Sequence, residues 1–256
     1  MSFLADITDR NRVDARSRRH ELADLRARAA ERHPARGFGA ALRADGLSLI
    51  AEIKRASPSA GAINTGMDPA ERAGVYGRSG ARALSVLTEP EYFKGSLADL
   101  VAARAACSVP VLRKDFLCDP LHLAEASAHE ADAVLLIVAA LGRNELADLH
   151  AEALELGLDV LVEVHAPDEV GVALDAGATI IGINTRDLAT LSVDPSQIAR
   201  VRPEIPPGIT VVAESGIKTR ADVEPFDALG IDAILVGEAL MRADDVAETV
   251  RELLGT

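Results

Sequence analysis

Eight short apolar segments, distributed through the 256-residue chain after about residue 47, constrain its fold more than any other sequence feature. Their starts lie roughly 20 to 35 residues apart, which is the length of one βα unit. Longer stretches of Ala, Leu, Glu and Arg with helical periodicity separate them. The segments are Leu49–Lys54, Ala83–Leu87, Val109–Arg113, Ala133–Val138, Val160–Val164, Thr179–Asn184, Ile209–Glu214 and Ala233–Val236.

Continuous apolar strands that alternate with helices are typical of a parallel sheet covered on both faces. Eight such units predict an α/β fold of the closed (β/α)8 type, the TIM barrel, and the chain length suits one such domain. A doubly wound sheet is the competing fold, but it usually has five or six strands and a G-x-G-x-x-G turn, which this chain lacks. We therefore expect one barrel domain over residues 1–256.

The segment before the first strand predicts a helical extension, residues 1–47, packed on the barrel. Phe3 to Arg32 is strongly charged and has only sparse apolar positions, so we expect one or two amphipathic helices there. These apolar positions are Leu4, Ile7, Val13, Leu22 and Leu25.

Composition excludes several classes of partner. The formal net charge is −13, so nucleic acid and anionic membranes are unsuitable partners, and a bound anion would need a local positive site. Met1 to Arg19 has no apolar core of a signal peptide, and the longest apolar run, Ala133 to Leu141, is too short to span a bilayer. Cys107 and Cys118 offer neither a disulfide framework nor metal-ligand spacing, so we expect a cytoplasmic protein.

Two of only four lysines stand at the ends of predicted strands. Glu52 and Lys54 are two residues apart and so point to the same side of the first strand, into the barrel. A structural ion pair at the barrel end would fit this spacing as well as a catalytic pair does. Lys114 follows the third strand, and its position alone would also fit a solvated strand end. Active sites of such barrels lie at the carboxyl ends of the strands.

Polar residues end two further strands. Glu163 lies between two valines of the fifth strand and should point into the barrel, where burial raises the pKa of a carboxylate and suits it to acid–base work. His165 just beyond it is expected in a loop or behind the site. Asn184 at the end of the sixth strand is a candidate hydrogen-bonding ligand. Arg186 either faces a ligand or pairs with Asp187.

Small residues follow the last two strands. Ser215 and Gly216 come after the seventh, and Gly237 comes after the eighth. Glycine allows backbone N–H groups to approach an anion closely, and the loops after strands seven and eight form the usual phosphate site of barrels. The sequence therefore predicts a phosphate site here.

Together these segments resemble the indole-3-glycerol phosphate synthase family, in order and without large gaps from about residue 36 to the end. The first and third segments with their continuations are the most specific to that family. The strings that carry the resemblance are Ile50 to Ser59, Ser85 to Pro90 with Tyr92-Phe93 and Gly95-Ser96, Val111 to Phe116, Leu161 to His165, Gly182 to Leu188, and Ala213 to Ile217.

The resemblance implies a carboxy-lyase of tryptophan biosynthesis that needs no metal and no organic cofactor. Its substrate would be 1-(2-carboxyphenylamino)-1-deoxyribulose 5-phosphate, which closes to a pyrrole ring and loses CO₂ and water. Lys114 matches the proton donor at the ketone oxygen, and Glu163 matches the general base for dehydration. Lys54 is a second candidate acid, and the division of the acid role between the two lysines stays open. Glu52 matches a carboxylate that orients the lysines.

The resemblance also implies binding residues. Asn184, Arg186 and Glu214 match positioning residues, Phe93 and Phe116 match an apolar wall, and Ser57, Lys54, Ser215, Gly216 and Gly237 match phosphate contacts. After this last glycine some relatives have Ser or Thr, whereas this chain has Glu238. We expect its carboxylate to turn away from the phosphate, which leaves only its backbone N–H for binding.

Three alternatives stay open from the sequence. A phosphoribosyl isomerase binds phosphate in the same fold, but it often uses an Asp-Asp or Cys-Asp pair where this chain has Glu52 and Glu163. A repurposed, non-catalytic barrel would be signalled by loss of Lys114 or Glu163, and both are present. A paralogue of a specialised indole pathway would keep every motif. We expect a monomer, with other tryptophan-pathway enzymes as candidate partners.

Overall fold

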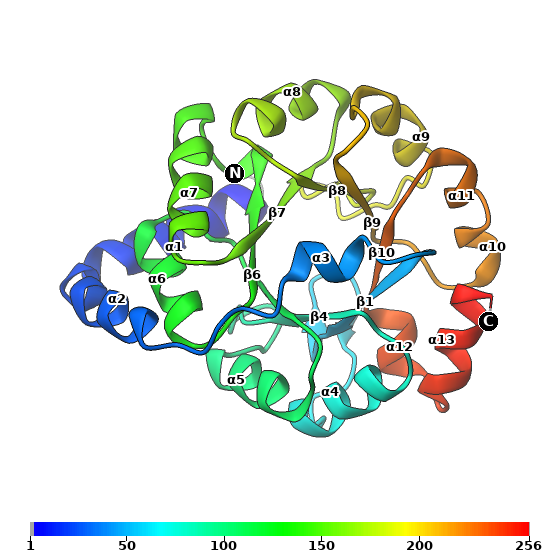
Figure 1. The fold of residues 1–256 in the computed structure, drawn as a ribbon, viewed down its shortest axis with the longest axis horizontal. Helices are drawn as coiled ribbons and strands as arrows, with labels where there is room; N and C mark the ends of the chain where they lie inside the picture. Colours follow the sequence, from blue (N-terminus) through cyan, green and yellow to red (C-terminus); the bar gives the residue numbers. More distant parts are fainter. Residues whose placement is uncertain (1–2, 256) are drawn as a thin grey trace.

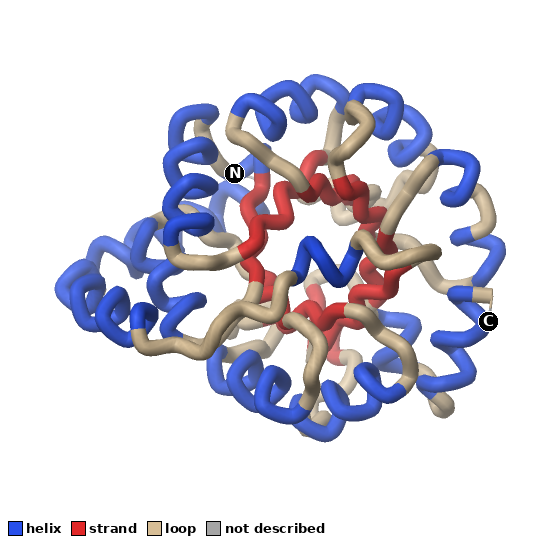
Figure 2. Tube along the Cα trace, in the orientation of Figure 1, coloured by secondary structure: helices blue, strands red, loops and turns tan. Residues whose placement is uncertain are grey.

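Eight parallel strands close into a barrel in the computed structural model, which describes residues 3–255. Around the barrel the strand order is β1-β10-β9-β8-β7-β6-β5-β4. The strands are β1 (Ser48–Ile53), β4 (Ala83–Leu87), β5 (Val111–Lys114), β6 (Ala133–Ile137), β7 (Asp159–Val164), β8 (Ile180–Asn184), β9 (Thr210–Glu214) and β10 (Ala233–Val236). The predicted (β/α)8 barrel is confirmed, and Figure 2 shows the closed ring of strands inside a ring of helices. Residues 1–2 and 256, which the predicted domain includes, lie outside the described residues.

Helices follow the strands as the alternating pattern predicts. They are α4 (Pro69–Arg78), α5 (Leu97–Ala106), α6 (Pro120–Ala128), η2 (Val138–Ala140), α7 (Arg143–Glu155), α8 (Pro167–Asp175), α9 (Gln197–Val201), η3 (Arg202–Glu204), α10 (Arg220–Val223), α11 (Phe226–Leu229), α12 (Glu238–Arg242) and α13 (Val246–Leu254). A small antiparallel pair, β2 (Ala56–Ser57) and β3 (Gly61–Ala62), lies in the loop after β1 and was not predicted. Strands of two residues carry no periodic signal, so the sequence pattern could not reveal it.

Side-chain alternation along β1 shows how the strands position the site. Leu49, Ala51 and Ile53 are buried in the layer between barrel and helices. Ile50 is buried inside the barrel instead. Because successive side chains point to opposite faces, Glu52 points inward with it, as predicted.

The N-terminal extension runs from one end of the barrel to the other. Its elements are α1 (Phe3–Ser17), η1 (Arg19–Glu21), α2 (Leu22–Ala30) and α3 (Phe38–Leu42). Helix α2 lies beside α6, and α3 lies across the amino-terminal mouth of the barrel (Figures 1 and 2). Phe38 and Leu42 are buried in the barrel interior there. Thus α3 is an addition to the one or two helices that the sequence predicted, because five residues are too few to show helical periodicity.

Helix α1 lies at the opposite end of the barrel, near the carboxyl ends of the strands. Arg10 forms an ion pair of 2.6 Å with Glu89 in the loop after β4. Asn11 donates a hydrogen bond of 2.9 Å to the carbonyl oxygen of Phe116, after β5. The extension therefore contacts the loops that carry the predicted site. No helix within residues 3–255 is long and apolar enough to cross a membrane.

Candidate active site

A cavity of about 450 Å³ lies at the carboxyl ends of the barrel strands. Every site residue predicted from the sequence lines it: Glu52, Lys54, Ser57, Phe93, Lys114, Phe116, Glu163, Asn184, Arg186, Glu214, Ser215, Gly216, Gly237 and Glu238. They come from β1, β5, β7, β8 and β9 and from the loops that follow β1, β4, β5, β8, β9 and β10. Strand ends that are far apart in sequence thus converge on one volume.

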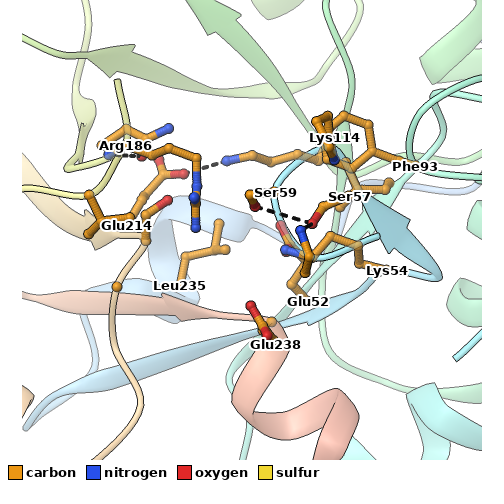
Figure 3. A pocket seen from close by; sticks show the side chains of 18 of the residues that line it. Glu52, Lys54, Ser57, Ser59, Phe93, Lys114, Arg186, Glu214, Leu235 and Glu238 are labelled. Atoms are coloured by element: carbon orange, nitrogen blue, oxygen red, sulfur yellow. Dashed lines mark hydrogen bonds and ion pairs between the residues drawn. The ribbon is translucent and has the colours of Figure 1, made fainter. Parts of the chain in front are cut away.

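Lys114 is the centre of the charged part of the cavity. Its ammonium lies 3.2 Å from Glu163 Oε2 and also contacts Glu214 Oε2. Figure 3 shows its side chain extending across the cavity from the side of Phe93 toward Glu214. Burial alone would lower the pKa of Lys114, but the surrounding carboxylates, Glu214 first, raise that pKa above its ordinary value. The ammonium is therefore protonated at neutral pH.

The two carboxylates that share this ammonium differ in their pKa. For Glu163 burial acts to raise the pKa, but the charge of Lys114 and contacts with His165 and Asn184 outweigh it, so the pKa lies below its ordinary value. The sequence-based expectation of a raised pKa at Glu163 is therefore wrong. Burial and the charge of Glu163 instead raise the pKa of Glu214 to about 7, against the opposing effect of Lys114. Glu163 is therefore the more readily ionised of the two carboxylates, and Glu214 holds a proton more readily.

A glycine gives Glu214 its position. A Cβ atom added at Gly182 on β8 would lie 2.1 Å from Glu214 Oε1. We expect Gly182→Ala to displace this carboxylate from Lys114 and to lower kcat, whereas Gly171→Ala, where nothing lies within 4 Å of an added Cβ, should leave kcat unchanged. Steady-state kinetics of the two variants checks this, and equal kcat values would contradict it.

The raised pKa of Glu214 predicts a pH-dependent stability. Its pKa is about 7 in the folded protein against an ordinary 4.5, so the folded state binds more protons between these values, and the stability that Glu214 contributes is lost as pH rises through this window. Glu214→Gln keeps the neutral shape and should remove this loss. We expect the Tm of the variant minus that of the wild type to increase between about pH 4.5 and 7. A constant difference in thermal melts would contradict the assignment.

Glu52 and Lys54 form a separate ion pair, with 2.6 Å between Oε1 and Nζ. A Cβ atom at Gly237 would lie 2.3 Å from Glu52 Oε1 and 3.2 Å from Lys54 Nζ, so only glycine leaves room for the pair. Glu52 thus contacts one lysine directly and acts on Lys114 through its charge alone. Figure 3 shows this pair on the side of the cavity near Ser57.

The loop after β9, where the sequence predicts a phosphate site, contains two successive residues in the left-handed region. Ser215 and Gly216 both have positive φ angles, of 68° and 77°, and Thr185 Oγ1 donates to the carbonyl oxygen of Ser215 at 3.2 Å. A Cβ at Gly216 would lie 2.7 Å from Val193. Only glycine therefore fits at Gly216, and both residues of the turn line the cavity.

Glu238 begins α12 and engages a neighbour on its own helix. Its Oε1 accepts a hydrogen bond of 3.1 Å from Arg242 Nε. The carboxylate thus pairs with a cation of its own helix, and its turning away from a bound phosphate stays a prediction. Arg242 and Lys218 also line this end of the cavity, and neither was predicted. Both residues lie close in sequence to the glycine loops, and this position could have identified them as cavity residues.

The opposite end of the cavity is apolar. The rings of Phe93 and Phe116 lie 6.1 Å apart, and Phe3 of α1 lies 5.9 Å from Phe116. Glu89, fully buried, accepts the backbone N–H groups of Tyr92 and Phe93 and so fixes the loop. Phe3 was missed because the sequence pattern does not show where the extension crosses the barrel.

Asn184 and Arg186 are linked to each other. Asn184 Oδ1 accepts the backbone N–H of Arg186 at 3.0 Å, and the Arg186 guanidinium donates to the carbonyl oxygen of Leu191 at 2.9 Å. Asp187 accepts the backbone N–H groups of the following turn instead. The sequence left two roles open for Arg186. The structure favours a side chain that faces the cavity over one that pairs with Asp187.

Comparison with known proteins identifies the family that shares this site. A family model described as indole-3-glycerol phosphate synthase matches residues 5–253. The chain is 49% identical over 256 residues to indole-3-glycerol phosphate synthase 1 of Streptomyces coelicolor, covering 99% of this chain and 95% of that protein. It is 47% identical to the indole-3-glycerol phosphate synthase of Rhodococcus jostii, with the same coverage.

Solved structures support the fold. The crystal structure of a 3-hexulose-6-phosphate synthase has a TM-score of 0.63 and 17% sequence identity, covering 82% of this chain and 99% of that chain. At this identity the similarity concerns the barrel alone. The family match, by contrast, favours the synthase over the phosphoribosyl isomerase that the sequence left open.

Proposed function

The chain belongs to the indole-3-glycerol phosphate synthase family, and we propose how the residues of its cavity divide the work of that reaction. The enzyme is a carboxy-lyase of tryptophan biosynthesis. The substrate we assign is 1-(2-carboxyphenylamino)-1-deoxyribulose 5-phosphate, which loses CO₂ and water to give indole-3-glycerol phosphate.

The substrate lies across the cavity with its phosphate and its ring at opposite ends. The phosphate binds the backbone N–H groups after β9 and β10 and the ammonium of Lys54, with Ser57 nearby. The carboxyphenyl ring packs against Phe93 and Phe116. This orientation is supported by the separation of the glycine turns from the aromatic rings, and it places the ketone between the two ends, near Lys114.

Lys114 acts first, as the acid that protonates the ketone oxygen while the ring carbon attacks. The observation that carries the proposal is the ammonium of Lys114 held between Glu163 and Glu214. These carboxylates keep the ammonium charged and aimed into the cavity, where it also stabilises the developing oxyanion. Loss of CO₂ then restores the aromatic ring without a further proton.

Dehydration completes the reaction. Glu163 removes a proton from the methylene carbon beside the ring nitrogen. The charge of Lys114 keeps Glu163 ionised, and Glu163 becomes a stronger base once Lys114 has given its proton away. An ammonium, from Lys114 or Lys54, gives a proton to the departing hydroxyl. Asn184 holds Glu163 in place, and Arg186 and Glu214 position the substrate.

A direct assay tests this proposal. Purified protein is incubated with the substrate in the presence of EDTA, and the fluorescence of the indole product is followed. We expect steady turnover, since the assigned residues need no metal. A folded barrel, verified by circular dichroism, that forms no indole would contradict the proposal.

We also propose that the protein is a monomer and that it resides in the cytoplasm. Free thiols at Cys107 and Cys118 support a reducing compartment. Sedimentation at micromolar concentration should give one species near 26.9 kDa, and a larger species would contradict the monomer.

A further inference from the structure

The proposed reaction consumes one solvent proton in each turnover. The substrate carboxylate departs as CO₂ and leaves its bonding electrons in the ring. The ketone oxygen departs as water and needs two protons. One of them is the methylene proton that Glu163 removes, so the second must come from solvent. The inference below rests on the proposed function, because this balance belongs to that reaction.

The residues that handle these protons are shielded from water. The side chain of Lys114 is 13% exposed, and that of Glu163 is 2% exposed. Bound substrate would cover the cavity side still further. Rapid recharging of Lys114 therefore calls for a route through the protein rather than through the occupied cavity.

One titratable side chain contacts Glu163 from outside the cavity. His165 Nε2 lies 3.3 Å from Glu163 Oε1, while Lys114 contacts the other oxygen of the same carboxylate. On its far side, His165 Nδ1 lies 3.8 Å from Oε2 of Glu169, in the first turn of α8. Glu169 is 20% exposed. The four side chains form a row from the surface to the cavity.

We propose that His165 transfers the solvent proton to Glu163, and through Glu163 to Lys114, once in each turnover. The proton reaches Nδ1 from the side of Glu169, and Nε2 releases one to Glu163 Oε1. The carboxyl group of Glu163 then turns about its Cγ–Cδ bond, and this proton passes to the Lys114 amine, which has given its own proton to the ketone oxygen. When Lys114 also protonates the departing hydroxyl, the methylene proton held on Glu163 recharges it, so only protons move and each group returns to its starting state.

The surroundings of His165 suit this task. Burial acts to lower its pKa, but Glu163 on β7, Glu169 on α8 and Glu214 on β9 together raise that pKa above its ordinary value. Asp187, after β8, adds a further negative charge. These acidic neighbours favour the protonated form of the imidazole, and Lys114 beyond Glu163 opposes it.

Both ring nitrogens of His165 are buried and form no hydrogen bond, so backbone contacts alone hold this residue in the row. The His165 N–H donates to Glu169 Oε2 at 2.5 Å, and Gln197 donates to the His165 carbonyl oxygen. His165→Asn therefore keeps the backbone contacts and removes only the proton-carrying ring. His20→Asn, at an exposed position in η1, is the matched control.

Steady-state kinetics tests the route. We expect His165→Asn to lower kcat by at least about tenfold with KM changed less than about twofold. The solvent deuterium isotope effect on kcat should rise, and free imidazole in the buffer should restore much of the lost rate. Glu163→Gln should gain nothing from imidazole, and His20→Asn should match the wild type.

Two results would overturn the route. One is a wild-type kcat in His165→Asn. The other is a lower kcat with an unchanged isotope effect and no restoration by imidazole, in a variant shown to be folded, since that pattern indicates a structural role. If the asparagine variant does not fold, His165→Gln replaces it under the same criteria. Inactivity of the wild type would instead contradict the proposed function and, with it, the proton route through His165.

Discussion

Replacing Lys114 by Met should lower kcat for indole formation by about 10³-fold or more, which is the largest loss we expect from any single substitution. The methionine side chain has a similar length but can neither protonate the ketone oxygen nor stabilise its charge. Ring closure is the first chemical step, so neither CO₂ nor indole should appear. Release of CO₂ and fluorescence of indole, measured together, check this result.

The same substitution should lower stability. Lys114 is the cation shared by Glu163 and Glu214, both buried. Removing one partner of a buried ion pair costs about 3–5 kcal/mol. We expect a lower Tm, with the deficit smaller at low pH, where the two carboxylates can take up protons.

Lys94→Met is the matched control, because Lys94 is exposed and lies outside the cavity lining. It should retain the wild-type kcat. Near-normal turnover in Lys114→Met would remove Lys114 from the mechanism.

Replacing Glu163 by Gln should lower kcat for indole by about 10²- to 10⁴-fold and leave KM nearly unchanged. The amide keeps the shape of the carboxylate but cannot accept the methylene proton. Because Lys114 still contacts Glu214, ring closure and decarboxylation should proceed. A single turnover should therefore release CO₂ before, and in excess of, indole.

This separation of CO₂ from indole distinguishes the two substitutions. Glu155→Gln, at an exposed position near the end of α7, is the control and should release both products together. If Glu163→Gln loses CO₂ release and indole formation in equal measure, then Glu163 acts in ring closure and its role as the dehydration base is wrong.

Most of the barrel could be predicted because its strands and helices follow a periodic pattern of apolar residues in the sequence. Eight apolar segments at the spacing of a βα unit leave few alternatives, and the inward direction of Glu52 follows from the alternation of side chains along a strand. The short α3 and the β2–β3 pair carry no such signal. Their positions depend on contacts that form only in the folded chain, such as Phe38 entering the barrel interior.

The residues of the cavity could also be predicted, but their electrostatics could not. A strand end identifies Glu163 and Glu214 as inward-facing carboxylates, yet it does not reveal which of them His165 and Asn184 approach. The carboxylate that these two residues approach has the lowered pKa, and the other has the raised pKa. Phe3 was equally hidden, since only the path of the extension brings α1 to the apolar end of the cavity.

The most direct test of the account is a crystal structure of the protein with its product, indole-3-glycerol phosphate. We expect the phosphate within hydrogen-bond distance of the backbone N–H groups of Gly216 and Gly237, with the indole ring against Phe93 and Phe116. Lys114 should remain between Glu163 and Glu214 and face the glycerol carbon attached to the ring. A phosphate bound at the aromatic end, or an indole ring out of reach of Lys114, would contradict the assignment of the site.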